Sequence, residues 1–135
     1  MSLDSKIAIV TGGTRGIGRA ISTELASRGA HVIACYRASE ADAQSLVAET
    51  ERLAGSVDVI QLDISDHVAV DTALSALQER LGRVDILVNN AGIICDRLLI
   101  QMTPDEWQRV IQTNLTGLYN VSRAVAAGML LARSG

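Results

Sequence analysis

Short apolar runs alternate along the chain with longer segments in which apolar residues recur every three or four positions. The short runs are typical of strands buried on both faces, and the longer segments are typical of helices with one buried face. The predicted strands cover residues 6–11, 31–36, 57–62 and 84–88. The predicted helices cover residues 16–28, a segment from Ser39 to near Gly55, a segment ending at Gly82, and 104–131.

Local signals mark several helix ends. Gly29 ends the first predicted helix and Gly82 the third, because glycine readily adopts the left-handed conformation that closes a helix. Ser39 is placed to cap the second helix. The last helix begins with an S/T-x-x-E box, in which Thr103 and Glu106 each satisfy a backbone N–H of the first turn. The apolar face of this helix consists of Trp107, Ile111, Leu115, Leu118 and Val125.

Four strand–helix repeats with short connections predict right-handed crossovers and a parallel sheet with helices on both faces. Because a glycine-rich turn follows the first strand, we expect a Rossmann-like α/β three-layer half-fold, with four helices and the strand order 3-2-1-4. A chain of 135 residues has room for a single domain with a sizeable core.

Composition narrows the class of protein further. Hydrophobic residues make up 48% of the chain but aromatic residues only 2%, which suits a parallel sheet packed with Val, Ile, Leu and Ala. A net charge of −3 without a basic run argues against nucleic acid or an anionic membrane as a partner. No signal region and no membrane-spanning apolar run is present, so we expect a cytoplasmic protein. Cys35, Cys95 and the two histidines lack ligand spacing, so no metal site is predicted.

The glycine-rich turn at 11–18 carries the most informative chemistry. Its glycines tolerate positive φ and let a ligand approach the backbone, and the helix that follows offers unpaired N–H groups to a diphosphate. The spacing G-x-x-x-G-x-G differs from both the G-x-G-x-x-G fingerprint and the P-loop. Two further motifs, at 62–64 and 89–92, follow the third and fourth strands. All three loops are therefore expected to converge on one crevice at the carboxyl ends of the strands.

With these motifs the chain resembles the short-chain dehydrogenase/reductase family. The matching residues are the turn Thr11–Gly18, Asp63, the Asn89–Gly92 motif, and Asn114 within Gln112–Gly117. Within the family, the segment 84–99 is most similar to 3-oxoacyl-(acyl carrier protein) reductases, with acetoacetyl-CoA reductases close behind. The resemblance covers essentially all 135 residues. It implies a nicotinamide nucleotide as cofactor and a ketoreductase framework.

The resemblance assigns the turn to the diphosphate, Asp63 and Ile64 to the adenine, and Asn90–Gly92 to the adenosine ribose. The last motif can equally serve as a structural turn that stabilises the central sheet. The resemblance implies that Asn114 holds a helix kink and a water that relays protons in complete members of the family. Asn114 can equally be a polar residue whose hydrogen bonds are formed within its own helix. Its catalytic role depends on a missing half. The predicted cofactor-binding residues are Gly12, Thr14, Arg15, Gly16, Ile17, Gly18, Tyr36, Arg37, Ser39, Asp63, Ile64, Asn90, Ala91 and Gly92.

The end of the second strand discriminates between the two cofactors. A fold that prefers NAD carries an acidic residue there for the ribose 2′-OH. This chain has Tyr36-Arg37-Ala38-Ser39 instead, so Arg37, Ser39 and Arg15 can bind a 2′-phosphate through charge-assisted hydrogen bonds. Arg37 can also be an ordinary exposed loop charge. We favour NADP(H) over NAD(H).

Members of the family reduce a carbonyl with a Ser and a Tyr-x-x-x-Lys pair, in which the lysine lowers the tyrosine pKa. The one lysine here, Lys6, lies at the first strand, and Tyr119 is followed four residues later by Arg123. We therefore interpret residues 1–135 as a single truncated Rossmann-type dinucleotide-binding domain. Its cofactor affinity is expected to be weak, and it is expected to lack oxidoreductase activity alone.

Two alternatives remain open: a truncated folding unit that self-associates without a functional ligand, and one half of a split ketoreductase. In each case the strand 84–88 is an edge with unpaired backbone groups, and the helix 104–131 loses part of the surface that it would cover. We expect a homodimer or larger homo-oligomer joined through that strand edge, that helix, or both.

Overall fold

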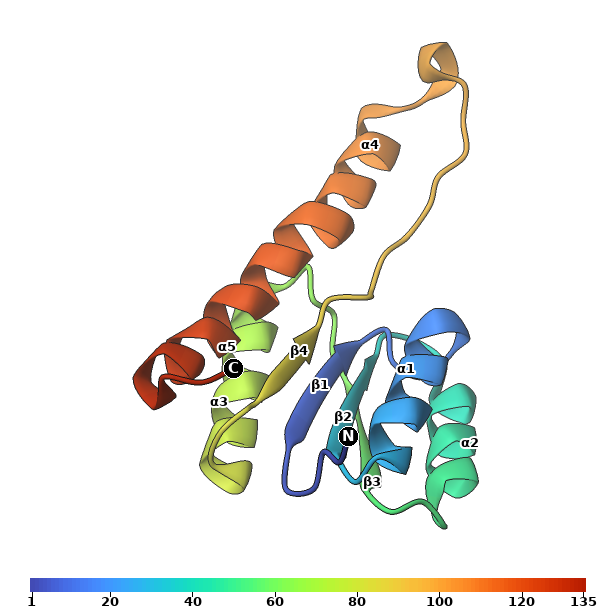
Figure 1. The fold of residues 1–135 in the computed structure, drawn as a ribbon. Helices are drawn as coiled ribbons and strands as arrows, with labels where there is room; N and C mark the ends of the chain where they lie inside the picture. The colour runs from blue at the N-terminus through green and yellow to red at the C-terminus, as the bar shows by residue number, and fades with distance from the viewer.

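A four-stranded parallel sheet in the order β3-β2-β1-β4 forms the centre of the computed structural model, which describes residues 1–135 (Figure 1). The strands are β1 (Ile7–Thr11), β2 (His31–Tyr36), β3 (Ser56–Gln61) and β4 (Ile86–Val88). β1 pairs with β2 from Ile7 opposite His31 to Thr11 opposite Cys35. The predicted Rossmann-like fold and strand order are confirmed.

Helices cover both faces of this sheet, α1 and α2 on one side and α3 and α5 on the other (Figure 1). Their bounds are α1 (Gly16–Ser27), α2 (Glu40–Thr50), α3 (His67–Leu81), α4 (Pro104–Ile111) and α5 (Leu118–Ala132), with a short 3₁₀ helix at Leu99–Gln101. A π-helical segment, Gln112–Gly117, joins α4 to α5 in one continuous rod, so the prediction of four helices is confirmed. None of the helices combines the length and the hydrophobicity that crossing a membrane requires.

The predicted element bounds hold to within a few residues except at two places. The second helix ends at Thr50 rather than near Gly55. The fourth strand begins at Ile86 rather than at residue 84. Just before it, the buried carboxylate of Asp85 accepts the backbone N–H of Ile7 at 2.9 Å and pairs with Lys6 at 3.2 Å, and the Asp85 N–H donates to the carbonyl of Ile7 at 2.9 Å. These bonds hold the segment before β4 beside the start of β1.

Three members of the predicted apolar face of the last helix are exposed. Trp107, Leu115 and Leu118 are 54%, 63% and 43% exposed. A π turn holds one residue more than an α turn, so the segment 112–117 rotates the helix faces on its two sides relative to one another. The buried residues of the rod are instead Thr113, Gly117, Asn120, Val121 and Val125. α4 buries no residue and projects beyond the sheet (Figure 1).

Candidate functional site

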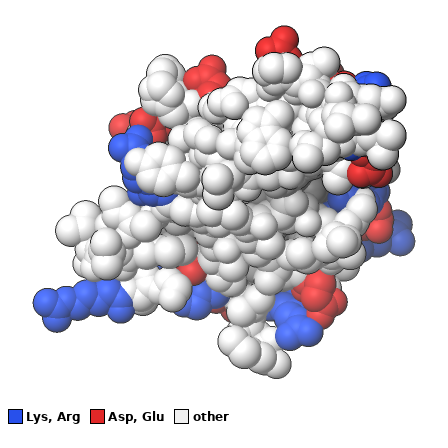
Figure 2. All heavy atoms as spheres, turned by 90° about the horizontal axis from the view of Figure 1, so that it is seen from above, with Lys and Arg blue, Asp and Glu red and all other residues white.

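A pocket of about 620 Å³ lies at the carboxyl ends of the strands, where the loops after β1, β2, β3 and β4 meet. Figure 2 looks down on this end of the molecule and shows a largely uncharged surface with charged side chains at its margins. All of the predicted cofactor-binding residues line this pocket except Ile17 and Gly18. The structure adds five lining residues that the sequence did not single out, namely Cys35, Ala38, Leu62, Ile93 and Thr113.

The glycine-rich turn needs its glycines for two different reasons. Gly12 and Gly16 have φ of +62° and +56°, a conformation that L side chains rarely adopt. Gly18 instead lies beneath the turn, where a Cβ would stand 2.0 Å from the carbonyl oxygen of Gly12. Gly18 therefore supports the turn from below, and the Ile17 side chain is 75% exposed.

The start of α1 is the feature of this pocket best suited to an anion. Side chains cap α2, α3 and α4 at Ser39, Asp66 and Thr103, but no side chain caps α1 at Arg15. The first turn of α1 contains no acidic residue. Free N–H groups at a helix start, together with the positive end of the helix dipole, attract negatively charged groups. The uncapped start of α1 is thus open to a diphosphate.

A buried hydroxyl holds the loops after β1 and β4 together. The Thr11 Oγ1 accepts the backbone N–H groups of Asn90 and Ala91, each at 3.0 Å. In return the Asn90 side-chain amide donates to the carbonyls of Thr11 and Gly12, both at 3.1 Å. These four bonds fix the floor of the pocket. They support the structural role considered for Asn90, while its contact with a ligand stays a prediction.

Two arginines at the pocket have no side-chain partner in the protein. Arg15 lies in the turn and Arg37 follows β2, and neither forms an ion pair or a side-chain hydrogen bond, whereas Arg19 nearby is fully bonded. Ser39 accepts the N–H of Asp42 at 3.3 Å as the cap of α2. Because a hydroxyl has one O–H donor besides its acceptor positions, Ser39 can still donate to an anion.

The wall of the pocket that follows β3 carries Asp63, an exposed carboxylate near Arg37. Its Oδ1 accepts from the Ser65 hydroxyl at 2.6 Å and from the Ser65 N–H at 3.0 Å. The hydrogen bond from the Ser65 hydroxyl, with the N–H bond and the nearby positive charge of Arg37, holds the pKa of Asp63 below its usual value despite partial burial. The group is therefore an ionised acceptor, and its Oδ2 is free of protein partners. Such an oxygen suits the amino group of an adenine.

Amide side chains from the helical rod hold the loops that carry this wall. Gln112 Nε2 donates to the carbonyl of Ser65 at 3.1 Å, and Asn120 Nδ2 donates to the carbonyl of Ile64 at 2.9 Å. Asn114 binds both backbone groups of Ile93, accepting from its N–H and donating to its carbonyl, each at 2.8 Å. Asn114 is thus satisfied across two elements rather than inside its helix. It does not line the pocket itself.

The cysteines supply no nucleophile at this pocket. Burial raises the pKa of the Cys35 thiol to about 12, so the group stays protonated at neutral pH. Both cysteines are free thiols. No three His, Cys, Asp or Glu side chains are grouped so that they could hold a metal ion.

This chain is similar in sequence to known proteins. A family model described as short chain dehydrogenase matches residues 6–135. The 3-oxoacyl-[acyl-carrier-protein] reductase FabG of Vibrio harveyi is 44% identical over 135 residues, which are 100% of this chain and 54% of that protein. The chain therefore spans about half the length of the curated relatives that it matches.

Solved structures share the fold over nearly the whole chain. A short chain dehydrogenase from Burkholderia cenocepacia in complex with NADP superposes with a TM-score of 0.89 at 41% identity, covering 95% of this chain and 52% of that one. A metagenomic short-chain oxidoreductase in complex with NADP gives a TM-score of 0.94 at 34% identity, covering 100% of this chain and 61% of that one. NADP is thus bound by both of these neighbours.

Proposed function

The chain belongs to the short-chain dehydrogenase family, and from that premise we propose that it binds NADP(H) in the pocket at the carboxyl ends of its strands. The observation that carries this proposal is the pair of arginines, Arg15 and Arg37, that line the pocket without a partner in the protein. Guanidinium groups bind phosphate through paired, charge-assisted hydrogen bonds. No carboxylate stands at the end of β2, where one would favour the 2′-OH of NAD and repel a 2′-phosphate.

The remaining residues fit the other parts of the nucleotide. The uncapped start of α1 and the glycine-rich turn suit the diphosphate, and a Cβ at Gly12 would stand 3.1 Å from the Cα of Ala91, so the turn packs closely on the loop after β4. The free oxygen of Asp63 suits the adenine amino group. Asn90, Ala91 and Gly92 lie where the adenosine ribose is expected. When bound, NADP(H) donates or accepts a hydride.

We propose that this chain does not reduce a carbonyl group by itself. A proton donor of the Tyr-x-x-x-Lys type requires a lysine, and the one lysine, Lys6, pairs with Asp85 before the start of β1, at the end of the sheet opposite the pocket. Arg123, four residues after Tyr119, is bound to Asp71 through both carboxylate oxygens. We therefore propose a 3-oxoacyl-(acyl carrier protein) reductase-like framework whose nucleotide site is present and whose proton donor is not. Ketone-dependent oxidation of NADPH by the purified chain would overturn this.

Titration of the chain with NADPH and NADH, followed by nucleotide fluorescence or calorimetry, tests the binding proposal. A charge-assisted hydrogen bond contributes about 1.5–3 kcal/mol, so Arg37→Ala should weaken NADPH binding by about 10- to 100-fold and leave NADH binding nearly unchanged. Arg52→Ala is the matched control, because Arg52 is equally exposed and unpaired but lies outside the pocket. Saturable binding of neither nucleotide by the unsubstituted chain would refute the function.

Self-association is a second part of the proposal. β4 pairs with β1 alone and leaves its other edge open, and large apolar side chains are exposed along the rod and the loop before it, among them Trp107, Leu115 and Leu118. Exposed apolar surface of this kind marks interaction sites. We propose a homodimer or larger oligomer through the β4 edge, the rod, or both. A monodisperse monomer by light scattering at tens of micromolar would refute this.

We also propose that the protein is cytoplasmic. Both cysteines are free thiols, which suits a reducing compartment. The net charge of −3 supports the exclusion of nucleic acid as a partner.

A further inference from the structure

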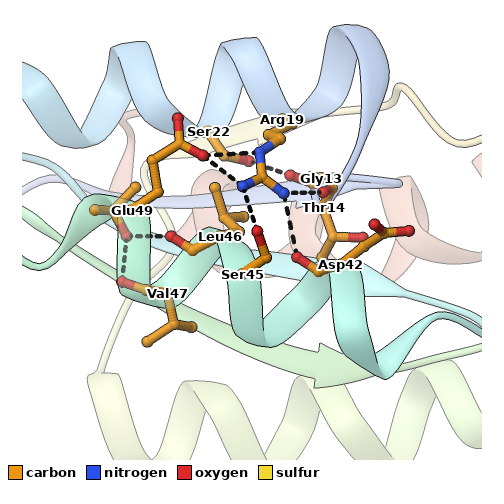
Figure 3. Close-up of polar contacts among 10 residues, drawn as sticks. Gly13, Thr14, Arg19, Ser22, Asp42, Ser45, Leu46, Val47 and Glu49 are labelled. Carbon is orange, nitrogen blue, oxygen red and sulfur yellow. Dashed lines mark hydrogen bonds and ion pairs between the residues drawn. The ribbon is translucent and has the colours of Figure 1, made fainter.

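Arg19 extends from α1 toward α2, and its guanidinium bonds to two segments, the glycine-rich turn and α2 (Figure 3). Nη1 donates to the carbonyl of Thr14 at 3.2 Å and to the carbonyl of Asp42 at 3.3 Å. Nη2 donates to the Ser45 hydroxyl at 3.0 Å, and both Nη2 and Nε donate to the Glu49 carboxylate, Nε at 3.0 Å. A guanidinium has five N–H donors, and these bonds engage all of them. Arg19 therefore has no donor left with which to bind a phosphate itself.

The two carbonyls that Arg19 holds belong to the two segments that carry the proposed 2′-phosphate ligands Arg15 and Ser39. Thr14 directly precedes Arg15 in the glycine-rich turn. The N–H of Asp42 donates to the Ser39 hydroxyl at 3.3 Å, so the residue whose carbonyl Arg19 binds also holds Ser39. One guanidinium thus connects the backbone next to one proposed phosphate ligand with the helix start that carries another.

A second side-chain bond ties the glycine-rich turn to α1, whereas the start of α2 depends on Arg19 alone. The Ser22 hydroxyl donates to the carbonyl of Gly13 at 2.9 Å and is fully buried (Figure 3). The turn therefore stays attached to α1 when Arg19 is altered. The start of α2 has no comparable side-chain bond to α1 besides those of Arg19. Altering Arg19 should release α2 from the turn more than it releases the turn from α1.

We infer that Arg19 is a positioning residue that fixes the spacing between the glycine-rich turn and the start of α2, and thereby sets the preference for NADP(H) over NAD(H). The inference rests on the proposed function. In the proposed site a 2′-phosphate contacts Arg15 on the turn and Ser39 at the start of α2 at the same time, whereas a nucleotide without that phosphate does not depend on Ser39. Loosening the spacing therefore weakens NADP(H) binding more than NAD(H) binding.

The substitution Arg19→Lys tests this, because lysine keeps the charge but has no planar fork that could reach both carbonyls and the carboxylate. Arg28→Lys is the matched control, since Arg28 lies at the other end of α1 and forms only an exposed ion pair with Glu24. We expect Arg19→Lys to lower the ratio of the Kd for NADH to the Kd for NADPH by about tenfold, and Arg28→Lys to leave it unchanged. An equal loss of affinity for both nucleotides would overturn the inference.

Amide hydrogen exchange of the nucleotide-free chain gives a readout that does not depend on binding. In Arg19→Lys the amide of Asp42, which donates to the Ser39 hydroxyl, should exchange faster, and in Arg28→Lys it should not change. If the unsubstituted chain binds neither nucleotide, the proposed function fails while this measurement still decides the positioning role. Unchanged exchange at Asp42 in Arg19→Lys would overturn that role, and faster exchange would support it.

Discussion

Removing the Thr11 hydroxyl should destabilise the chain more than removing the Thr11 methyl group. The side chain is 1% exposed, and its Oγ1 accepts two backbone N–H groups from the loop after β4 while donating to the carbonyl of Val88 at 3.4 Å. Thr11→Val keeps the shape and removes the acceptor. Thr11→Ser keeps the acceptor and removes one methyl group.

The expected magnitudes differ for these two changes. An N–H group left without its partner in a partly buried position costs about 1–1.5 kcal/mol, so Thr11→Val should lower the free energy of unfolding by about 2–3 kcal/mol. The methyl group lost in Thr11→Ser contributes about 1 kcal/mol. A domain stable by about 5–15 kcal/mol remains folded in both cases.

Urea unfolding measures the difference directly. With a slope of about 2 kcal/mol per molar urea, the midpoint of Thr11→Val should fall by about 1–1.5 M and that of Thr11→Ser by about 0.5 M, at an unchanged slope. Amide exchange at Asn90 and Ala91 should accelerate in Thr11→Val alone. A Thr11→Val midpoint at or above that of Thr11→Ser would refute the reasoning, because the hydroxyl would then contribute less than a methyl group.

Two further substitutions test the turn and the opposite end of the sheet. Gly18→Ala should destabilise the chain by about 3 kcal/mol or more and abolish nucleotide binding, since its Cβ would stand 2.0 Å from the Gly12 carbonyl oxygen. Gly16→Ala has open space around it and should lower the free energy of unfolding by only about 1 kcal/mol. Equal thermal stability of the two variants would contradict this packing. Burial opposes ionisation of Asp85, but hydrogen bonds from Ile7, Arg83 and Lys6 outweigh it and hold the pKa of Asp85 below 3.8. This stabilisation is present above pH 3.8 and is lost as the pH falls through the lower folded value, so Asp85→Asn should flatten the dependence of the unfolding free energy on acid pH. If the unfolding free energy of Asp85→Asn depends on acid pH as strongly as that of the unsubstituted chain, the Asp85 carboxylate does not supply this stabilisation.

Features encoded by neighbouring residues could be predicted from the sequence. The capping box at Thr103 and Glu106 is formed as expected, with both of its hydrogen bonds present. The apolar runs gave four strands in the correct order, because parallel strands with helical crossovers permit few arrangements. The four loop motifs meet at one pocket for the same reason.

Features that depend on distant partners could not be predicted. The bonds of Gln112 to Ser65 and of Asn114 to Ile93 join residues that are 47 and 21 positions apart, and an amide side chain carries no local sign of its partner. Arg19 looks like an ordinary surface residue on α1 until α2 is placed beside it. Which members of the predicted apolar face pack on the sheet could not be read from the sequence, because a constant period of about 3.6 residues does not continue through the π-helical segment that contains Leu115.

The π-helical segment 112–117 also determines how this chain tolerates changes in length. One residue corresponds to about 100° of rotation in an α-helix. Deleting a residue within the segment would let it relax to an α-helix and leave Val121 and Val125 in place against the sheet. Deleting a residue within α5 would turn those two buried valines away from the core. Within the part of the rod that packs on the sheet, this segment is thus the place where the length can vary without unpacking the core, and the side chains that hold the pocket loops begin there.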